Sequence, residues 1–173
     1  MLKKFQPDYV DRHFNDVNIE KLKTLNKKLV ICDIDNTLVA HDEADVSDKA
    51  EAFLRALNAA RLEVILVSNN TEDRVQRFNE PLNFKAYPMA LKPLAKTYNQ
   101  IFKDYPHIKK SEMIALGDQV MTDVWGAKRQ NIDVILTEPI VQKDLIFTKI
   151  NRHIENVVMK LLKKRGLWPN EKM

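Results

Sequence analysis

The sequence predicts an α/β fold of three layers, α/β/α, with a central parallel sheet of about five strands. Short apolar runs bounded by polar clusters recur along the chain, as expected of strands buried on both faces. Stretches with apolar residues at helical spacing separate these runs, and this alternation is typical of right-handed βαβ units. The 173 residues are expected to form a single domain over 1–173, with its core at about 29–140.

The elements follow one another in a regular order. Strands are expected at 29–32, 63–67, 84–87, 112–116 and 133–137. Helices are expected at 20–28, behind Ser47 as an N-cap, at 72–78, with Pro93 in a first turn, and at 122–129. Each strand is thus followed by a helix, which returns the chain to the start of the next parallel strand.

The last element is a basic amphipathic helix at about 144–165. Residues 143–173 contain eight Lys and Arg against three Asp and Glu, so the basic character of the chain lies here. Apolar residues from Ile146 to Leu162 form one stripe, and Gly166 is expected to cap the helix. Two alternatives stay open: the stripe packs on the sheet edge, or the helix attaches to an anionic membrane with Trp168 near the interface.

Composition disfavours several classes of protein. One cysteine, Cys32, rules out an internal disulfide framework and fits a reducing compartment. No apolar stretch of about 18 residues is present, and the charged first residues lack the apolar core of a signal peptide. Three glycines without a G-x-G-x-x-G motif disfavour a dinucleotide-binding fold. We therefore expect a cytoplasmic protein, and the basic helix would permit peripheral contact with the inner membrane surface.

Two acids, Asp33 and Asp35, stand where the first apolar strand ends. Open α/β sheets bind ligands at this carboxyl edge. Two carboxylates in a dry pocket repel each other unless a cation neutralises them, and oxygen ligands favour Mg²⁺. An Asp-x-Asp pair by itself also fits a polar turn that caps the strand.

Polar residues also follow the later strands. Ser68 and Asn69 follow the second strand, Lys92 lies beyond the third, and Asp118 and Asp123 follow the fourth. Because parallel strands end at one edge of the sheet, these groups are expected to converge. The acids would hold a cation and the other groups an anion, which is the combination that phosphoryl transfer needs. A carboxylate can also act as a nucleophile and form an aspartyl phosphate.

Four segments together resemble the complete motif set of the haloacid dehalogenase (HAD) superfamily of phosphatases. They are Asp33-Ile34-Asp35-Asn36-Thr37, Ser68-Asn69-Asn70, Lys92-Pro93 and Gly117-Asp118-Gln119 followed by Thr122-Asp123. The segment from Phe5 to Val10 makes the chain similar to the YqeG family of subclass IIIA. That family is related to mitochondrial phosphatidylglycerophosphate phosphatases. The resemblance implies a Rossmann-like HAD fold, and the short spacing between the motifs leaves no room for a cap domain.

The resemblance implies a role for each motif residue. Asp33 would be the nucleophile, and Asp35 would protonate the leaving group and then activate water. Ser68 and Asn69 would donate hydrogen bonds to the phosphoryl oxygens, and Lys92 would neutralise charge.

The resemblance also implies a set of metal ligands. Mg²⁺ would be held by the carboxylates of Asp33 and Asp118 and by the backbone carbonyl of Asp35. Asp123 would help directly or through water.

The sequence therefore predicts a Mg²⁺-dependent phosphatase with an open site. An open site suits a phosphate presented from outside, on a lipid head group such as phosphatidylglycerophosphate, a phosphoprotein or a nucleic-acid end. A small metabolite would fit if a partner subunit in an oligomer supplied a lid. The alternative is a non-catalytic protein on the same scaffold that binds ribosomal RNA or a GTPase through the basic tail.

Overall fold

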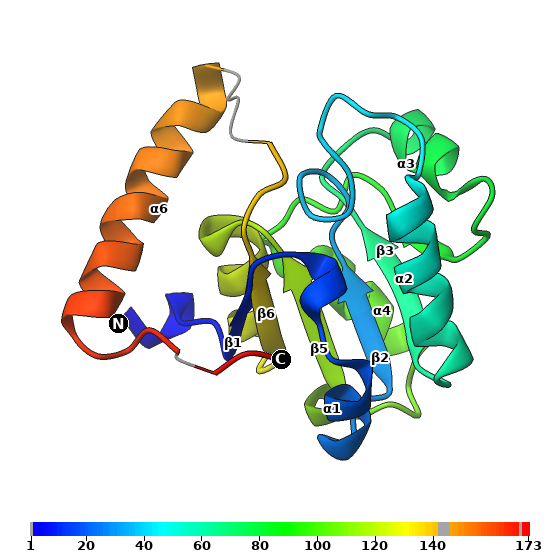
Figure 1. Cartoon of the computed structure of the whole chain (residues 1–173), viewed down its shortest axis with the longest axis horizontal. Coiled ribbons are helices and arrows are strands. Elements are labelled where there is room, and N and C mark those ends of the chain that lie inside the picture. Colours follow the sequence, from blue (N-terminus) through cyan, green and yellow to red (C-terminus); the bar gives the residue numbers. More distant parts are fainter. Residues whose placement is uncertain (1, 142–145, 170) are drawn as a thin grey trace.

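The computed structural model describes residues 2–141, 146–169 and 171–173, and over 146–153 it describes the backbone alone. Its centre is a six-stranded, wholly parallel sheet with the strand order β1-β6-β5-β2-β3-β4 (Figure 1). The strands are β1 (Tyr9–Asp11), β2 (Leu29–Cys32), β3 (Glu63–Val67), β4 (Lys85–Tyr87), β5 (Met113–Gly117) and β6 (Asp133–Thr137). The three-layer parallel architecture is confirmed, and β1 is one strand more than the five expected.

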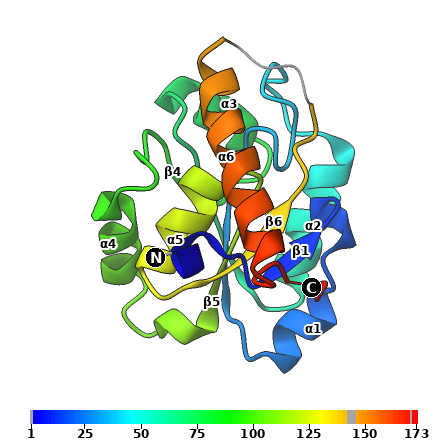
Figure 2. The same ribbon diagram turned by 90° about the vertical axis from the view of Figure 1, so that its left-hand side faces the viewer.

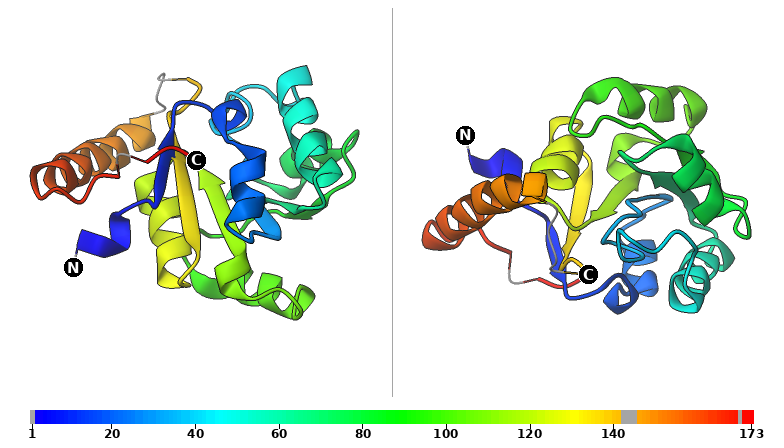
Figure 3. Two further views of the ribbon diagram at one scale, coloured as in Figure 1. Left: turned by 60° about the horizontal axis from the view of Figure 1, so that its bottom comes forward. Right: turned by 90° about the horizontal axis from the view of Figure 1, so that it is seen from above.

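Helices cover both faces of the sheet (Figure 3). The α-helices are α1 (Ile19–Thr24), α2 (Asp48–Ala59), α3 (Glu72–Asn79), α4 (Ala95–Asp104), α5 (Trp125–Arg129) and α6 (Ile146–Lys164). Short 3₁₀ turns lie at η1 (Leu2–Phe5), η2 (Phe14–Asp16) and η3 (Lys110–Glu112), and a π-helical turn, η4 (Val120–Val124), precedes α5.

Alternate residues of β2 point into two separate apolar cores, as the period of a strand requires. Val30 and Cys32 pack in the core under α1, α2 and α3, whereas Leu29 and Ile31 pack in the core under α4 and α5. The strand is buried along its whole length. It therefore lies at the centre of the domain, and its carboxyl end is held rigidly from both sides.

Ser47 and Pro93 were both expected at the start of a helix. Ser47 is the N-cap of α2, and its hydroxyl oxygen accepts a hydrogen bond from the amide of Ala50 at 3.3 Å, as expected. The prediction for Pro93 is wrong, because α4 begins two residues later at Ala95. The side chain of Asn69 accepts a hydrogen bond from the amide of Lys92 at 2.7 Å and donates one to its carbonyl at 3.2 Å. These two bonds hold Lys92 in the loop before α4.

Helix α6 lies outside the β1 edge of the sheet (Figures 1 and 2). The first two residues of the predicted range 144–165 lie outside the described residues, and so do the side chains of the stripe before Ile154. Leu162 is buried, whereas Ile154, Val157 and Leu161 are 40–44% exposed. The helix therefore packs on the core through one face and presents a second apolar face outward. No helix among the described residues is long and apolar enough to cross a membrane.

The end of the chain returns to the sheet. The amide of Val10 in β1 donates to the carbonyl of Glu171 at 3.2 Å, and the amide of Met173 donates to the buried carboxylate of Asp11 at 3.2 Å. Gly166, with φ +64°, lies directly beyond α6, as expected of a helix-ending glycine. These contacts anchor the segment that follows α6 against β1.

Candidate active site

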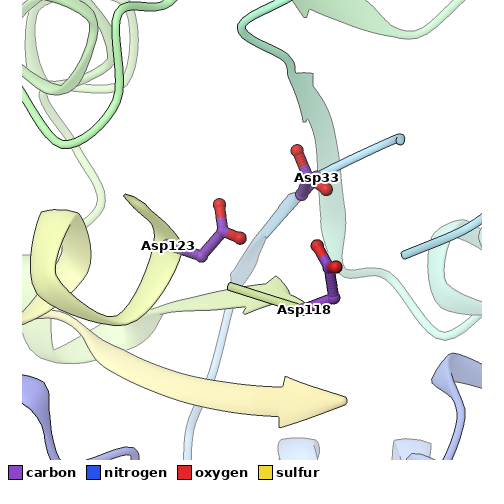
Figure 4. A group of neighbouring side chains, drawn as sticks. All are labelled: Asp33, Asp118 and Asp123. Carbon is purple, nitrogen blue, oxygen red and sulfur yellow. The ribbon is translucent and has the colours of Figure 1, made fainter. Parts of the chain in front are cut away.

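Three carboxylates meet at the carboxyl edge of the sheet (Figure 4). Asp33 follows β2, Asp118 follows β5, and Asp123 comes from the π-helical turn η4. One carboxylate oxygen of each lies within 4.8 Å of those of the other two, and the residues are at most 8% exposed. The structure thus brings together acids that are up to 90 residues apart in the sequence, and we call them the acid cluster.

Lys92 inserts its ammonium group into the acid cluster. Its Nζ lies 2.5 Å from Asp33 Oδ1 and 2.6 Å from Asp123 Oδ1, and the side chain is 6% exposed. Asn69 fixes the backbone of Lys92 on both sides of the residue. Asn69 therefore positions the lysine, and both its side-chain oxygen and its side-chain nitrogen are used in these bonds.

Thr37 links two members of the acid cluster. Its hydroxyl lies 2.8 Å from Asp33 Oδ2 and 3.3 Å from Asp118 Oδ1. The turn that returns Thr37 towards β2 contains Asn36 at φ +63°, a conformation that asparagine adopts more readily than most residues. Thr37 belongs to the first motif, but its place in the sequence did not predict this link between Asp33 and Asp118.

Asp35 points away from the acid cluster, towards β3 and α3. Its Oδ2 accepts a hydrogen bond from the Ser68 hydroxyl at 2.8 Å, and its Oδ1 lies 3.1 Å from Arg74 Nη2. Arg74 also donates to the backbone carbonyls of Glu43 and Ala44 in the loop that follows the first motif. The carboxylate of Asp35 therefore lies outside the acid cluster, and its backbone carbonyl stays the atom that is predicted to bind the metal.

Close approach at the end of β5 depends on Gly117. A Cβ atom at this position would lie 2.4 Å from the carboxyl carbon of Asp123, a distance that real side chains do not show. Asp123 Oδ2 in turn accepts the amide of Gln119 at 3.0 Å. The absence of a side chain at 117 therefore lets Asp123 fold back over the strand end.

Burial and mutual repulsion perturb the ionisation of the acid cluster. Burial raises the pKa of Asp33 to about 7; Lys92 opposes this shift and Asp123 adds to it. Burial, then Asp33 and Asp123, raise the pKa of Asp118 well above its usual range. Burial alone would lower the pKa of Lys92, but Asp123 and Asp33 outweigh it and raise that pKa.

One lysine does not balance three buried carboxylates. Burial and this deficit of positive charge raise the pKa values of Asp33 and Asp118, and a cation among the oxygens would relieve the deficit. The donors are all hard oxygen atoms, the type that Mg²⁺ and Ca²⁺ prefer. The residues present therefore fit a divalent metal ion.

The surroundings of the acid cluster are short connecting segments. From residue 35 to residue 92, all of it described, the chain forms one loop, α2, β3, α3, β4 and a second loop. No domain is inserted in this range, as expected. The second loop exposes the large apolar side chains of Met89, Leu91 and Leu94 by 63, 50 and 52%.

Comparisons with known proteins identify the family of the chain. A family model described as a haloacid dehalogenase-like hydrolase matches residues 2–131. The "Probable phosphatase YqeG" of Bacillus subtilis (strain 168) is 35% identical to the chain over 167 residues, which are 96% of each protein. This likeness confirms the resemblance drawn from the motifs.

Solved structures of low sequence identity share the fold. A putative 3-deoxy-D-manno-octulosonate 8-phosphate phosphatase of Vibrio cholerae superposes with a TM-score of 0.54 at 14% identity, over 88% of this chain and 93% of that one. The cobalt-bound deoxy-D-mannose-octulosonate 8-phosphate phosphatase of Haemophilus influenzae gives 0.52 at 16% identity, over 80% and 90%. With the family model spanning most of the sequence, the chain belongs to the haloacid dehalogenase-like hydrolase family.

Proposed function

We propose that the protein is a phosphatase that hydrolyses a phosphomonoester through an aspartyl phosphate on Asp33. The observation that carries this proposal is the placement of Asp33 beside Lys92 in a buried acid cluster, with Asp35 on a separate set of hydrogen bonds. The two carboxylates therefore have different surroundings, which is what a nucleophile and a proton donor require. The name of the Bacillus relative supports the same activity.

The proposed reaction has two steps. A carboxylate oxygen of Asp33 attacks phosphorus, the bond from phosphorus to the alcohol oxygen breaks, and Asp35 gives its proton to that oxygen. Asp35 then takes a proton from a water molecule, which attacks phosphorus, releases inorganic phosphate and restores the Asp33 carboxylate. Lys92 stays next to Asp33 throughout and neutralises charge on the phosphoryl oxygens.

Asp33, Asp118 and Asp123, with the carbonyl of Asp35, would hold Mg²⁺. When bound, the ion would offset the charge of the acids and polarise a phosphoryl oxygen. Ser68 would donate to the phosphate in place of its bond to Asp35. Because both ends of the Asn69 amide are engaged by Lys92, we assign Asn69 to positioning the lysine rather than to contact with phosphate.

The experiment is turnover of 4-nitrophenyl phosphate by the purified protein. We expect activity that requires Mg²⁺, is abolished by EDTA and is lost in Asp33→Asn. Asp45→Asn, a change of the same kind at an exposed acid paired with Arg77, should keep full activity. Equal turnover by Asp33→Asn and the unmodified protein would exclude Asp33 as the nucleophile. A protein without any turnover that binds RNA in a salt-sensitive way would instead support the non-catalytic alternative.

The open edge suits a phosphate that is presented from outside the protein. Met89, Leu91 and Leu94 form an exposed apolar rim in the loop that carries Lys92. Exposed apolar side chains beside a phosphate site fit contact with a lipid surface, which would present a head-group phosphate such as that of phosphatidylglycerophosphate. We expect the protein to co-sediment with anionic vesicles at physiological salt, and failure to do so would argue against a lipid substrate.

A further inference from the structure

A cavity of about 350 Å³ separates α6 from the β1–β6 edge of the sheet, and we call it the α6 cavity. Val10, Val120 and Leu136 form its wall on the side of the core, and Met159 and Trp168 form its outer wall. Ligand pockets in proteins occupy about 300–1,000 Å³, so its volume lies at the lower end of that range. It is large enough for a compact organic group.

The α6 cavity borders the acid cluster at Asp118. Asp118, whose carboxylate belongs to that cluster, also lines the cavity, and so does Thr137 at the end of β6. A molecule with its phosphate at the acid cluster can therefore extend along Asp118 into the space beneath α6. The position of α6 gives this cavity a wall that the short connecting loops do not supply.

The charges around the α6 cavity limit what it can hold. Besides Asp118, two glutamates line it: Glu155, which is 8% exposed and accepts the amide of Met121 at 3.0 Å, and the exposed Glu138. Lys163 is the cation of the lining, and its ammonium lies 5.0 Å from the centre of the Trp168 ring. Acidic surroundings and apolar walls disfavour an anionic group and favour a neutral group with an apolar body.

We propose that the α6 cavity holds the alcohol portion of the substrate and selects phosphomonoesters of neutral, partly apolar alcohols. This inference rests on the proposed phosphatase function and adds to it a class of substrate. Phosphomonoesters whose alcohol carries a further anionic group, such as acidic phosphopeptides, would be poorer substrates. Of the substrates named above, this inference therefore also disfavours phosphatidylglycerophosphate, because its alcohol portion contains an anionic phosphodiester. Met159 and Trp168 are then specificity-determining residues rather than catalytic ones.

The test compares two substitutions on α6 that introduce the same side chain. Met159→Trp fills the cavity, whereas Val157→Trp adds the same bulk on the outer face, where Val157 is 44% exposed. The substrates are 4-nitrophenyl phosphate and acetyl phosphate, whose acetyl group is too small to need the cavity. We expect Met159→Trp to lower kcat/KM for the aryl ester at least tenfold and to change that for acetyl phosphate less than twofold, with Val157→Trp altering neither.

A binding measurement covers the case in which Met159→Trp fails to fold. The chain has two tryptophans, and Trp125 packs against Phe5 at a ring distance of 5.5 Å. In Trp125→Phe, the non-hydrolysable 4-nitrobenzylphosphonate should quench the fluorescence of Trp168. In Trp168→Phe, which leaves Trp125 as the reporter, the same titration should give little quenching.

The outcomes separate this inference from the proposed function. Absence of turnover with every phosphate compound would overturn the proposed function. Turnover of both test substrates with no selective loss in a folded Met159→Trp, or phosphonate binding without quenching of Trp168, would overturn the cavity assignment alone. A preference for an acidic phosphopeptide over aryl phosphates would also overturn it.

Discussion

Raising the pH without divalent metal should destabilise the fold. An aspartate in the unfolded chain ionises near its usual value of 3.8, whereas burial raises the pKa of Asp33 in the folded protein to about 7. Between these pH values the folded state retains a proton that the unfolded state has released. Stability therefore falls as the pH rises through this range, and the loss is complete above the folded pKa. The raised pKa of Asp118 acts in the same direction.

The expected loss of stability can be calculated for the interval from pH 5 to pH 8. Asp45, Asp104 and Glu112 have lowered pKa values through their hydrogen bonds, so their ionisation is complete below pH 5. Among the carboxyl groups, the interval from pH 5 to pH 8 consequently reports on the buried acids whose pKa values are raised. With a folded pKa of about 7, Asp33 alone lowers the free energy of unfolding by ~3 kcal/mol across this interval.

The assay is urea unfolding at pH 5 and pH 8, with EDTA and with Mg²⁺, followed by circular dichroism. Mg²⁺ should stabilise the protein more at pH 8 than at pH 5, because a metal binds the deprotonated carboxylates. Asp118→Asn should be more stable than the unmodified protein at pH 8 in EDTA and should respond less to the ion. Asp45→Asn, at an exposed acid, should keep both responses. A free energy of unfolding in EDTA that is equal at pH 5 and pH 8 would refute this reasoning.

Two further changes test the supports of the site. Arg74→Met should lower kcat for 4-nitrophenyl phosphate at least tenfold and alter the pH profile of kcat, because Arg74 pairs with Asp35. Arg77→Met is the control: it frees Asp45, in the loop that Arg74 also contacts, without touching Asp35, and it should retain normal kinetics. Gly117→Ala should displace the Asp123 carboxylate and weaken Mg²⁺ binding at least tenfold in calorimetry, with a loss of stability of about 1–3 kcal/mol by urea unfolding. Unchanged Mg²⁺ affinity in Gly117→Ala would show that Asp123 does not depend on this close approach.

The arrangement of the sheet could be predicted where apolar runs were long enough. Five strands were expected within a residue or so of their bounds, because buried parallel strands are almost continuously apolar. Strand β1 was missed since it has three residues, of which only Tyr9 and Val10 are apolar, and acids flank them. It is held by pairing with β6 and by the returning tail, which are contacts that no local pattern encodes.

The acid cluster and Lys92 could be placed from the sequence because parallel strands end at one edge. The contacts of Arg74 could not, since it is one of several charged residues near the start of α3 and its partners lie 30 or more residues away. The bonds of Asn69 could not be predicted from the sequence either. Its place after β3 indicated contact with phosphate, whereas its side-chain amide bonds the backbone of Lys92.

The position of β2 in the middle of the sheet affects how the protein is made. Asp33 leaves the ribosome early, whereas Lys92 and Asp123 are synthesised 59 and 90 residues later. A nascent chain that ends before η4 lacks part of the acid cluster, even if β2 and β3 have already paired. If the acid cluster holds a metal ion as proposed, the ion would bind late in biogenesis, and a truncated product of translation should be both metal-free and inactive.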